Sequence, residues 1–185
     1  LPPLDGVQYL VVTHRLFEAS AHSVAALKEA EGLKAAVVVV DDCSKDGTAE
    51  VLRAFARERG VAWRDDGPIE NGVELKGHGR RGKIEWVFLR HVLNGGKGKA
   101  VRTARAEATG ELSVIHDADL EYHPRDLVRI VKVFVEEEAD AVFGSRFAGG
   151  EARRALLFRH ELGNRLLTFL TNLVTNVNLT DMETC

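Results

Sequence analysis

The sequence predicts an α/β fold in which a mostly parallel sheet carries helices on both faces. Two observations predict it. Short apolar runs rich in β-branched residues alternate along the chain with segments of helical periodicity. The runs are continuously apolar, which is typical of strands covered on both faces and joined by right-handed crossovers. At 185 residues and 45% hydrophobic, the chain is expected to form a single domain spanning residues 1–185.

Five apolar runs are expected to be strands, at residues 9–13, 35–40, 84–89, 112–115 and 141–143. Residues 64–83 break this rhythm, because they are crowded with glycine and charge and show neither strand nor helix period. They are expected to form a mobile insertion or an exposed hairpin.

Helical patterns with recognisable ends lie between these runs. Residues 48–59 end at Gly60, and residues 99–108 end at Gly110. Pro124 suits the first position of a third helix. Residues 159–176 predict an amphipathic helix whose outer face is rich in amide and hydroxyl side chains.

The composition excludes some functions. A net charge of -3 and a pI near 6.2 lack the basic excess that nucleic-acid binding needs. The two cysteines, Cys43 and Cys185, show no disulfide or metal spacing, so we expect a cytoplasmic protein. No apolar run could span a bilayer. The sole methionine is Met182, so we expect a piece trimmed at both ends, from which a membrane anchor could be missing.

Two of the predicted strands end in acidic residues. The run 37–40 leads into Asp41 and Asp42, and the run 112–115 leads into Asp117 and Asp119. Ligands of parallel sheets gather at this edge. Close carboxylates repel one another, and Mg²⁺ or Mn²⁺ relieves the conflict while leaving coordination positions for a diphosphate. The tripeptide Asp117-Ala118-Asp119 is common by chance, so its place directly after a buried strand carries the prediction.

Asp41 and Asp42 stand at the end of an apolar strand, where two charges need partners. Base or ribose donors of a nucleotide would serve. The following residues, 46–48, are expected to do no more than make a turn and cap a helix.

Two further segments could contact phosphate. Residues 94–99 place Gly96 and Lys97 at a helix start, as in a phosphate-cradling loop, although the glycine spacing is not that of a Walker A sequence. An ordinary loop is the alternative. Arg146 follows the run 141–143, where it could grip a phosphate by a bidentate fork or form a surface salt bridge.

Several motifs taken together resemble the family 2 glycosyltransferases, which have the GT-A fold. The resemblance extends from about residue 9 to the end and is closest to the dolichyl-phosphate or polyprenyl-phosphate sugar transferases. It rests on Val40-Asp41-Asp42 with Asp46-Gly47-Thr48, Asn94 to Gly98, Asp117 to Glu121, Gly144-Ser145-Arg146-Phe147, and Gly163 to Leu166 with Leu179-Thr180-Asp181.

The resemblance implies a metal, Mg²⁺ or Mn²⁺, held by Asp117, Asp119 and Glu121, although family members more often carry Gln at the last position. It implies that Asp41 or Asp42 contacts the nucleoside of a UDP- or GDP-sugar. Lys97, beside Gly96, would lie near the base or diphosphate, and Arg146 would contact a phosphate of donor or acceptor.

The reaction expected is an inverting displacement in which Asp119 and Arg146 act as catalytic residues. A polyprenyl phosphate acceptor is already anionic near neutral pH, and it would bring the enzyme to the cytoplasmic face of a membrane, in peripheral contact with it. A hydroxyl acceptor would need a base, and Asp181 is the candidate.

Three alternatives stay open. The family usually shows Pro, an aromatic residue, Asn and Glu after the first strand, where this chain reads Val12 to Glu18, so a degenerate homologue could bind nucleotide sugar without turnover. A sugar nucleotidyltransferase would need a glycine-rich loop there, and residues 13–20 contain no glycine. A receiver-type signalling module would hold its acids closer together in sequence.

Overall fold

The computed structural model describes residues 7–12, 35–82, 84–110, 112–117, 124–147 and 158–183. Its contacts group the chain into two compact units, Leu1–Leu127 and Val128–Cys185, and each unit is described by itself. The single-domain organisation therefore stays a prediction. The altered segment after the first strand, the predicted metal ligands Asp119 and Glu121, and residues 148–157 lie outside the described residues.

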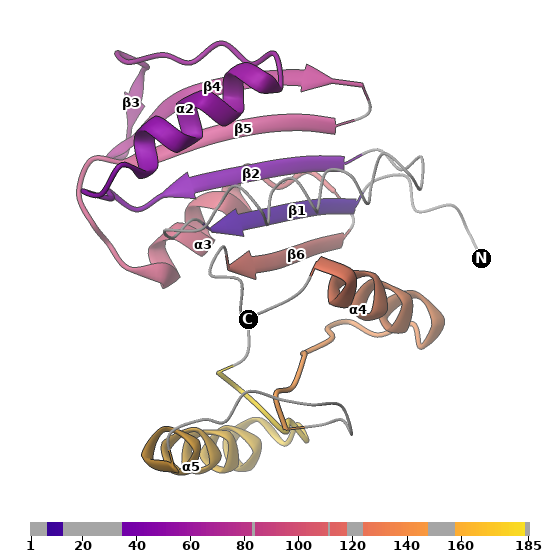
Figure 1. The fold of residues 1–185 in the computed structure, drawn as a ribbon. Helices are drawn as coiled ribbons and strands as arrows, with labels where there is room; N and C mark the ends of the chain where they lie inside the picture. Colours follow the sequence, from indigo (N-terminus) through magenta and orange to yellow (C-terminus); the bar gives the residue numbers. More distant parts are fainter. Residues whose placement is uncertain are drawn as a thin grey trace. The chain divides into compact units, whose positions relative to one another are not determined.

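The first unit is built on a six-stranded mixed sheet of strand order β3-β4-β5-β2-β1-β6 (Figure 1). Strands β5, β2, β1 and β6 run parallel, whereas β3 and β4 are antiparallel additions at one edge. This confirms the α/β class and the mostly parallel sheet. The strands are β1 (Val7–Val12), β2 (Ala35–Asp41), β3 (Ile69–Glu70), β4 (Val73–Arg81), β5 (Ile84–His91) and β6 (Leu112–Asp117).

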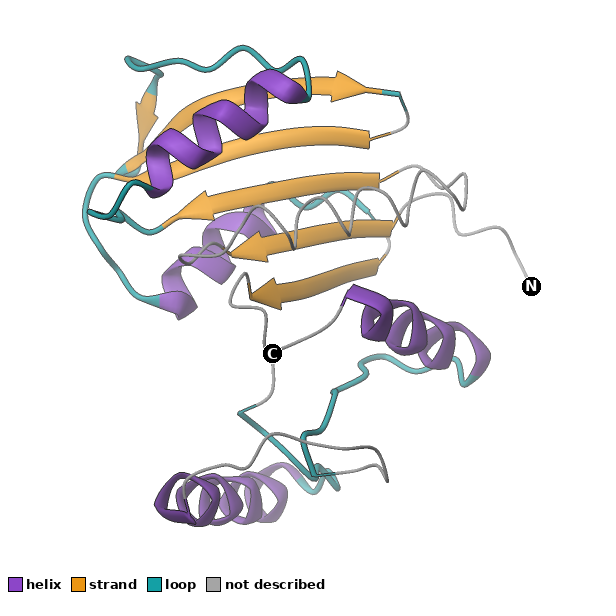
Figure 2. Cartoon of the chain, viewed as in Figure 1, coloured by secondary structure: helices purple, strands orange, loops and turns teal. Residues whose placement is uncertain are grey.

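The described helices are α2 (Thr48–Glu58), α3 (Lys97–Ala106), α4 (Pro124–Glu136) and α5 (Phe158–Thr175) (Figure 2). In the first unit α2 covers one face of the sheet and α3 the other, as predicted (Figure 1). Successive side chains of a strand point to opposite faces. Phe55 of α2 accordingly packs edge-on against Trp86, with ring centroids 5.2 Å apart. The opposite face forms a buried cluster of Val38, Val40, Leu89, Ala100 and Ala104.

The register brings the ends of the parallel strands to one edge of the sheet. Val12 pairs with Val40 on one side and with Asp117 on the other, and Asp41 pairs with Arg90. The polar residues that follow β2, β5 and β6 therefore converge, as the sequence predicts for a parallel sheet.

Residues 64–83 contain the β3–β4 hairpin, so of the two sequence-based alternatives the structure shows the hairpin. Two glycines of β4 lie against the turn that follows α2. A Cβ at Gly77 would be 3.0 Å from the carbonyl oxygen of Ala62, and one at Gly79 would be 3.1 Å from Val61. The glycines that made the segment look like a loop thus allow close packing of β4.

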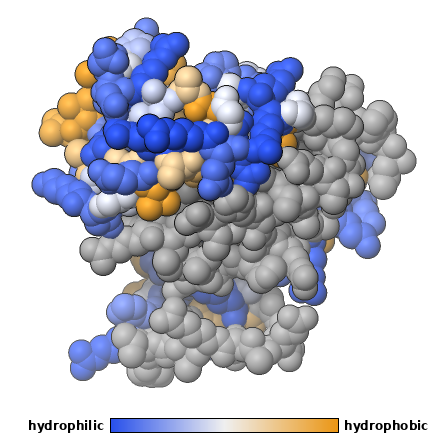
Figure 3. All heavy atoms as spheres, turned by 45° about the horizontal axis from the view of Figure 1, so that its top comes forward, coloured by the Kyte–Doolittle hydropathy of each residue, from blue (hydrophilic) through white to orange (hydrophobic). Residues whose placement is uncertain are grey.

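On the face drawn in Figure 3, hydrophilic side chains predominate among the coloured atoms.

The strand expected at 141–143 is wrong. Residues 141–145 have irregular backbone, and both Ala141 and Phe143 are exposed. A short apolar run becomes a strand only where a neighbouring strand takes up its backbone hydrogen bonds, and no described strand pairs with this run.

The orientation expected for the last helix is also wrong. On α5, Asn164 and Thr168 are buried, whereas a row of apolar side chains is exposed. The reason is that the amide and hydroxyl side chains bond to the segment that follows the helix: Asn172, for example, donates to the carbonyl oxygen of Leu179 and accepts from its N–H. Among the helices that the structure describes, none combines the length and the apolar character needed to cross a bilayer.

Candidate active site

A lysine and an aspartate from different elements meet at the edge where the parallel strands end. Asp117 is the last residue of β6, and Lys97 is the first of α3. The Nζ atom of Lys97 lies 2.6 Å from Oδ2 of Asp117. The lysine side chain is half exposed, while that of Asp117 is 18% exposed. Two of the predicted site residues are therefore in direct contact, and the pair is accessible to solvent.

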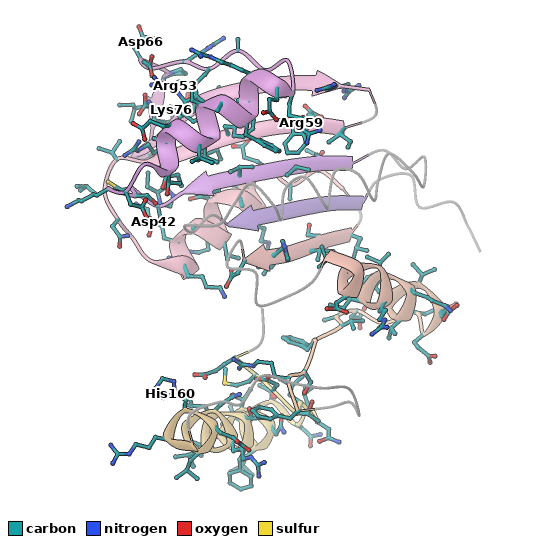
Figure 4. The ribbon with its side chains drawn as sticks, viewed as in Figure 1. Asp42, Arg53, Arg59, Asp66, Lys76 and His160 are labelled. Carbon is teal, nitrogen blue, oxygen red and sulfur yellow. The ribbon has the colours of Figure 1, made fainter. Side chains whose placement is uncertain are left out.

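The loop before α3 is organised around the carboxylate of Asp42 (Figure 4). The N–H of Gly95 donates to Oδ1 at 2.9 Å, and the N–H of Gly96 donates to Oδ2 at 2.6 Å. Gly96 has φ 78, a left-handed conformation that favours glycine. Successive N–H groups that point at one anion form an anion-binding nest. The loop predicted to cradle phosphate is thus a nest whose anion, in this structure, is Asp42.

His91 connects Asp42 to the second turn of α3. Its Nδ1 lies 2.5 Å from Oδ1 of Asp42, and its Nε2 lies 2.9 Å from the hydroxyl of Thr103. The histidine side chain is fully buried. Burial raises the pKa of Asp42, but the hydrogen bonds from His91, Gly95 and Gly96 lower it by more, so the net shift is downward.

His91 is not among the site residues predicted from the sequence. The predicted strand stops at residue 89, whereas β5 continues to His91. Both Arg90 and His91 are polar residues that close an apolar run, the same signal that identified Asp41 and Asp42. Applied to every strand, that signal would have found them.

Asp41 is more deeply buried than Asp42, with 1% of its surface exposed. Its Oδ1 accepts the N–H of Ser44 at 2.9 Å, and its Oδ2 lies 3.4 Å from Nε of Arg90 in an ion pair without hydrogen-bond geometry. Arg90 also donates to the carbonyl oxygen of Ser44. Asp41 therefore fixes the turn after β2, and its contact with a nucleoside stays a prediction.

The described part of the site fits a divalent cation only in part. Asp117 supplies one hard oxygen ligand of the kind that Mg²⁺ and Mn²⁺ prefer, and a positive charge already lies against it. The other two predicted ligands, Asp119 and Glu121, lie outside the described residues. Within the described ranges, no group of three or more His, Cys, Asp or Glu side chains could hold a metal ion.

Arg146 and Asp181 are paired within the second unit. Nε of Arg146 donates to Oδ2 of Asp181 at 2.8 Å, and Nη2 donates to Oδ1 at 2.9 Å. Arg146 thus makes the predicted bidentate interaction, but its partner is the carboxylate of Asp181. Of the two alternatives for Arg146, a salt bridge is therefore present, although it is buried at its acidic end rather than on the surface. The roles of Arg146 on a phosphate and of Asp181 as a base stay predictions.

The sequence profile described as Glycosyl transferase family 2 matches residues 11–185 of this chain. Two uncharacterised proteins of Methanocaldococcus jannaschii are each 29% identical to it, one over 65% of this chain and 44% of the relative, the other over 80% and 50%. The UDP-N-acetylglucosamine–dolichyl-phosphate N-acetylglucosaminyltransferase of Methanococcus voltae is 22% identical over 80% of this chain and 55% of the relative.

The chain thus spans about half the length of the curated relatives that it matches. Among solved structures it is similar to TarS of S. aureus (residues 1–349), with a TM-score of 0.44 and 19% identity, over 82% of this chain and 39% of that one.

Proposed function

Because this chain belongs to glycosyl transferase family 2, we propose that it transfers a sugar from a UDP- or GDP-sugar to a polyprenyl phosphate with inversion at the anomeric carbon. The leaving group of such a donor is a nucleoside diphosphate. The site must therefore stabilise the negative charge that develops on this leaving group. An acceptor phosphate is already anionic and needs no strong base.

The observation that carries the proposal is the contact of Lys97 with Asp117 beside the nest of Gly95 and Gly96. It places an ammonium group and a carboxylate at the ligand-binding edge of a parallel sheet, while the two N–H groups of the nest hold Asp42 beside them. A diphosphate with a divalent cation needs both kinds of group: an oxygen ligand for the cation and a positive charge for the phosphates.

The residues of this chain then take separate roles. Asp117, with Asp119 and Glu121, would hold Mg²⁺ or Mn²⁺, which supplies Lewis-acid stabilisation of the leaving diphosphate. Lys97, which contacts Asp117 in this structure, would bind a phosphate oxygen of the diphosphate. Asp42 holds the Gly95–Gly96 turn in place by accepting its two N–H groups. Either Asp42 or Asp41 contacts the nucleoside.

The acceptor class is supported by the name of the Methanococcus voltae relative, which transfers to dolichyl phosphate. An enzyme with such an acceptor works at a membrane surface, and we place this one at the cytoplasmic face. Two results would replace this proposal. One is transfer to a hydroxyl acceptor, and the other is binding of nucleotide sugar without turnover.

A thermal-shift screen tests donor binding. UDP- and GDP-sugars are added with Mg²⁺, with Mn²⁺ or with chelator, and one nucleotide is expected to raise Tm only when the cation is present. Transfer is then measured with UDP-N-acetylglucosamine and the best-binding donor, using polyprenyl phosphate or a free sugar as acceptor. If no nucleotide stabilises the chain in a metal-dependent way, the proposal is wrong.

Asp119→Ala is expected to abolish the metal-dependent part of the shift. Asp66→Ala is the matched control, because Asp66 is an exposed aspartate of the segment that leads into β3 (Figure 4). A metal-dependent shift that survives Asp119→Ala would place the cation elsewhere.

A further inference from the structure

The carboxylate of Asp181 is saturated with hydrogen bonds. It accepts from Nε, Nη2 and the backbone N–H of Arg146, and from Nδ2 of Asn164 at 2.6 Å. Two donors thus reach each oxygen. Asp181 itself is 1% exposed. A carboxylate oxygen has two lone pairs, so these four bonds use the acceptor capacity of the group.

The polar side of α5 holds this carboxylate in place. Asn164 donates to Asp181 and accepts from the hydroxyl of Thr168 at 3.2 Å. Thr168 in turn accepts the backbone N–H of Met182 at 3.1 Å. One turn of α5 therefore fixes both the side chain of Asp181 and the backbone beside it. Neither Asn164 nor Thr168 was assigned a role from the sequence.

A buried ion pair is weak evidence for stability, because removing two charges from water costs about as much as their attraction returns. The bonds from Asn164 and from the Arg146 backbone do, however, fix the position and direction of the pair. We propose that Asp181, seated by Asn164 and Thr168, is a positioning residue that orients the guanidinium of Arg146 toward a phosphate, and is not the base of the reaction. This rests on the proposed function.

The electrostatics agree with the geometry. Burial raises the pKa of Asp181, but the bonds from Arg146 and Asn164 lower it by more, so the pKa lies below its ordinary value. A general base near neutral pH needs a pKa shifted upward and an oxygen open to the proton that it takes. Asp181 meets neither requirement, because its pKa is lowered and both of its oxygens already accept hydrogen bonds.

The pairing also fixes the orientation of Arg146. A guanidinium is planar, and its Nε–Nη2 edge is held by Asp181. Because that edge is held, the orientation of the whole planar group is set. Loss of the pairing would leave the charge of Arg146 intact, but the orientation of its guanidinium would no longer be fixed.

The test compares Asp181→Asn and Asn164→Ala with the control Glu136→Gln. Glu136 forms an exposed ion pair with Lys132 on α4 and contributes none of the four hydrogen bonds of Asp181. The readouts are the ¹⁵N resonance of Arg146 Nε in the 185-residue chain, and kcat and acceptor KM against pH with a UDP- or GDP-sugar and polyprenyl phosphate.

Both site variants are expected to shift the Arg146 Nε resonance and to raise the acceptor KM, by about tenfold for Asp181→Asn, with the shape of the kcat profile against pH unchanged. Glu136→Gln changes neither. Loss of kcat by about a hundredfold or more in Asp181→Asn with acceptor KM unchanged would make Asp181 the base and overturn the inference.

Asn164→Ala keeps the test decisive if Asp181→Asn does not fold, because it removes only one of the four bonds. An unmoved Nε resonance with unchanged KM in that variant also overturns the inference. Failure of the proposed function is distinct, because the wild-type chain itself would then transfer no sugar to any phosphate.

Discussion

Lys97 Nζ lies 2.6 Å from Asp117 Oδ2, although the two residues are 20 positions apart and belong to different elements. Lys97 thus contacts the carboxylate that we propose as a ligand of a divalent cation. A divalent cation bound at Asp117, as we propose, would compete with Lys97 for this carboxylate, and a diphosphate bound to the cation would offer the lysine a new partner.

Lys97→Met is expected to have opposite effects on the two ligands. Binding of Mn²⁺ alone becomes about fivefold tighter, because a positive charge about 4 Å away in water is removed. Binding of UDP or GDP with Mn²⁺ weakens roughly tenfold, because a charged hydrogen bond to phosphate is lost. Titration followed by electron paramagnetic resonance of Mn²⁺ and by calorimetry measures both. Lys99→Met, two positions along α3, should change neither; equal effects of the two variants would contradict a specific role for Lys97.

His91→Ala is expected to destabilise the first unit by about 2–4 kcal/mol. The substitution removes a fully buried ring and leaves Asp42 and Thr103 without its hydrogen bonds. Urea unfolding followed by tryptophan fluorescence reports on this unit, because both tryptophans of the chain, Trp63 and Trp86, belong to it. The control is His78→Ala, which removes an exposed histidine from β4, the strand paired with β5. A similar loss in both variants would show that burial of His91 is not what matters.

Acid is expected to weaken the first unit through Asp42. The pKa of Asp42 is lower in the folded chain than its ordinary value of about 3.9. Its bonds therefore stabilise the fold fully above that value and are lost as pH falls through the lower folded pKa. Asp42→Asn should be less stable than wild type at pH 7 but should lose less stability between pH 5 and pH 3. Asp66→Asn serves as the comparison, and a wild-type-like acid dependence in Asp42→Asn would contradict the assignment.

Gly67→Ala is expected to destabilise the hairpin segment by about 2–3 kcal/mol. A Cβ at this position would lie 1.9 Å from the carbonyl oxygen of Leu75, a backbone atom that cannot rotate away. Leu75 also donates to Pro68, so moving it breaks a further bond. Thermal unfolding followed by tryptophan fluorescence measures the change.

The matched control is Gly163→Ala, where nothing lies within 4 Å of the added atom. Gly163 is inside α5, so alanine should raise helix stability by about 0.5–1 kcal/mol, measured by far-UV circular dichroism. Destabilisation by both alanines would argue against the clash at Gly67.

The sequence by itself determined the class of fold and the edge that carries the site. Valine-rich runs that are apolar throughout can be buried only between two layers of helices, and acids placed directly after them must gather where parallel strands end. Asp41, Asp42 and Asp117 were found in this way, because the signal is local.

Only the tertiary structure decided which partner each charged group has. Asp42 bonds to the N–H groups of a loop more than 50 positions away, and Arg146 grips Asp181 rather than standing open at a strand end. The expected strand at 141–143 and the orientation of α5 were wrong for the same reason. A strand needs a neighbour, and a helix turns its polar side inward when a returning segment, here 176–182, supplies buried hydrogen-bond partners. Such partners are distant in sequence, so no local pattern reveals them.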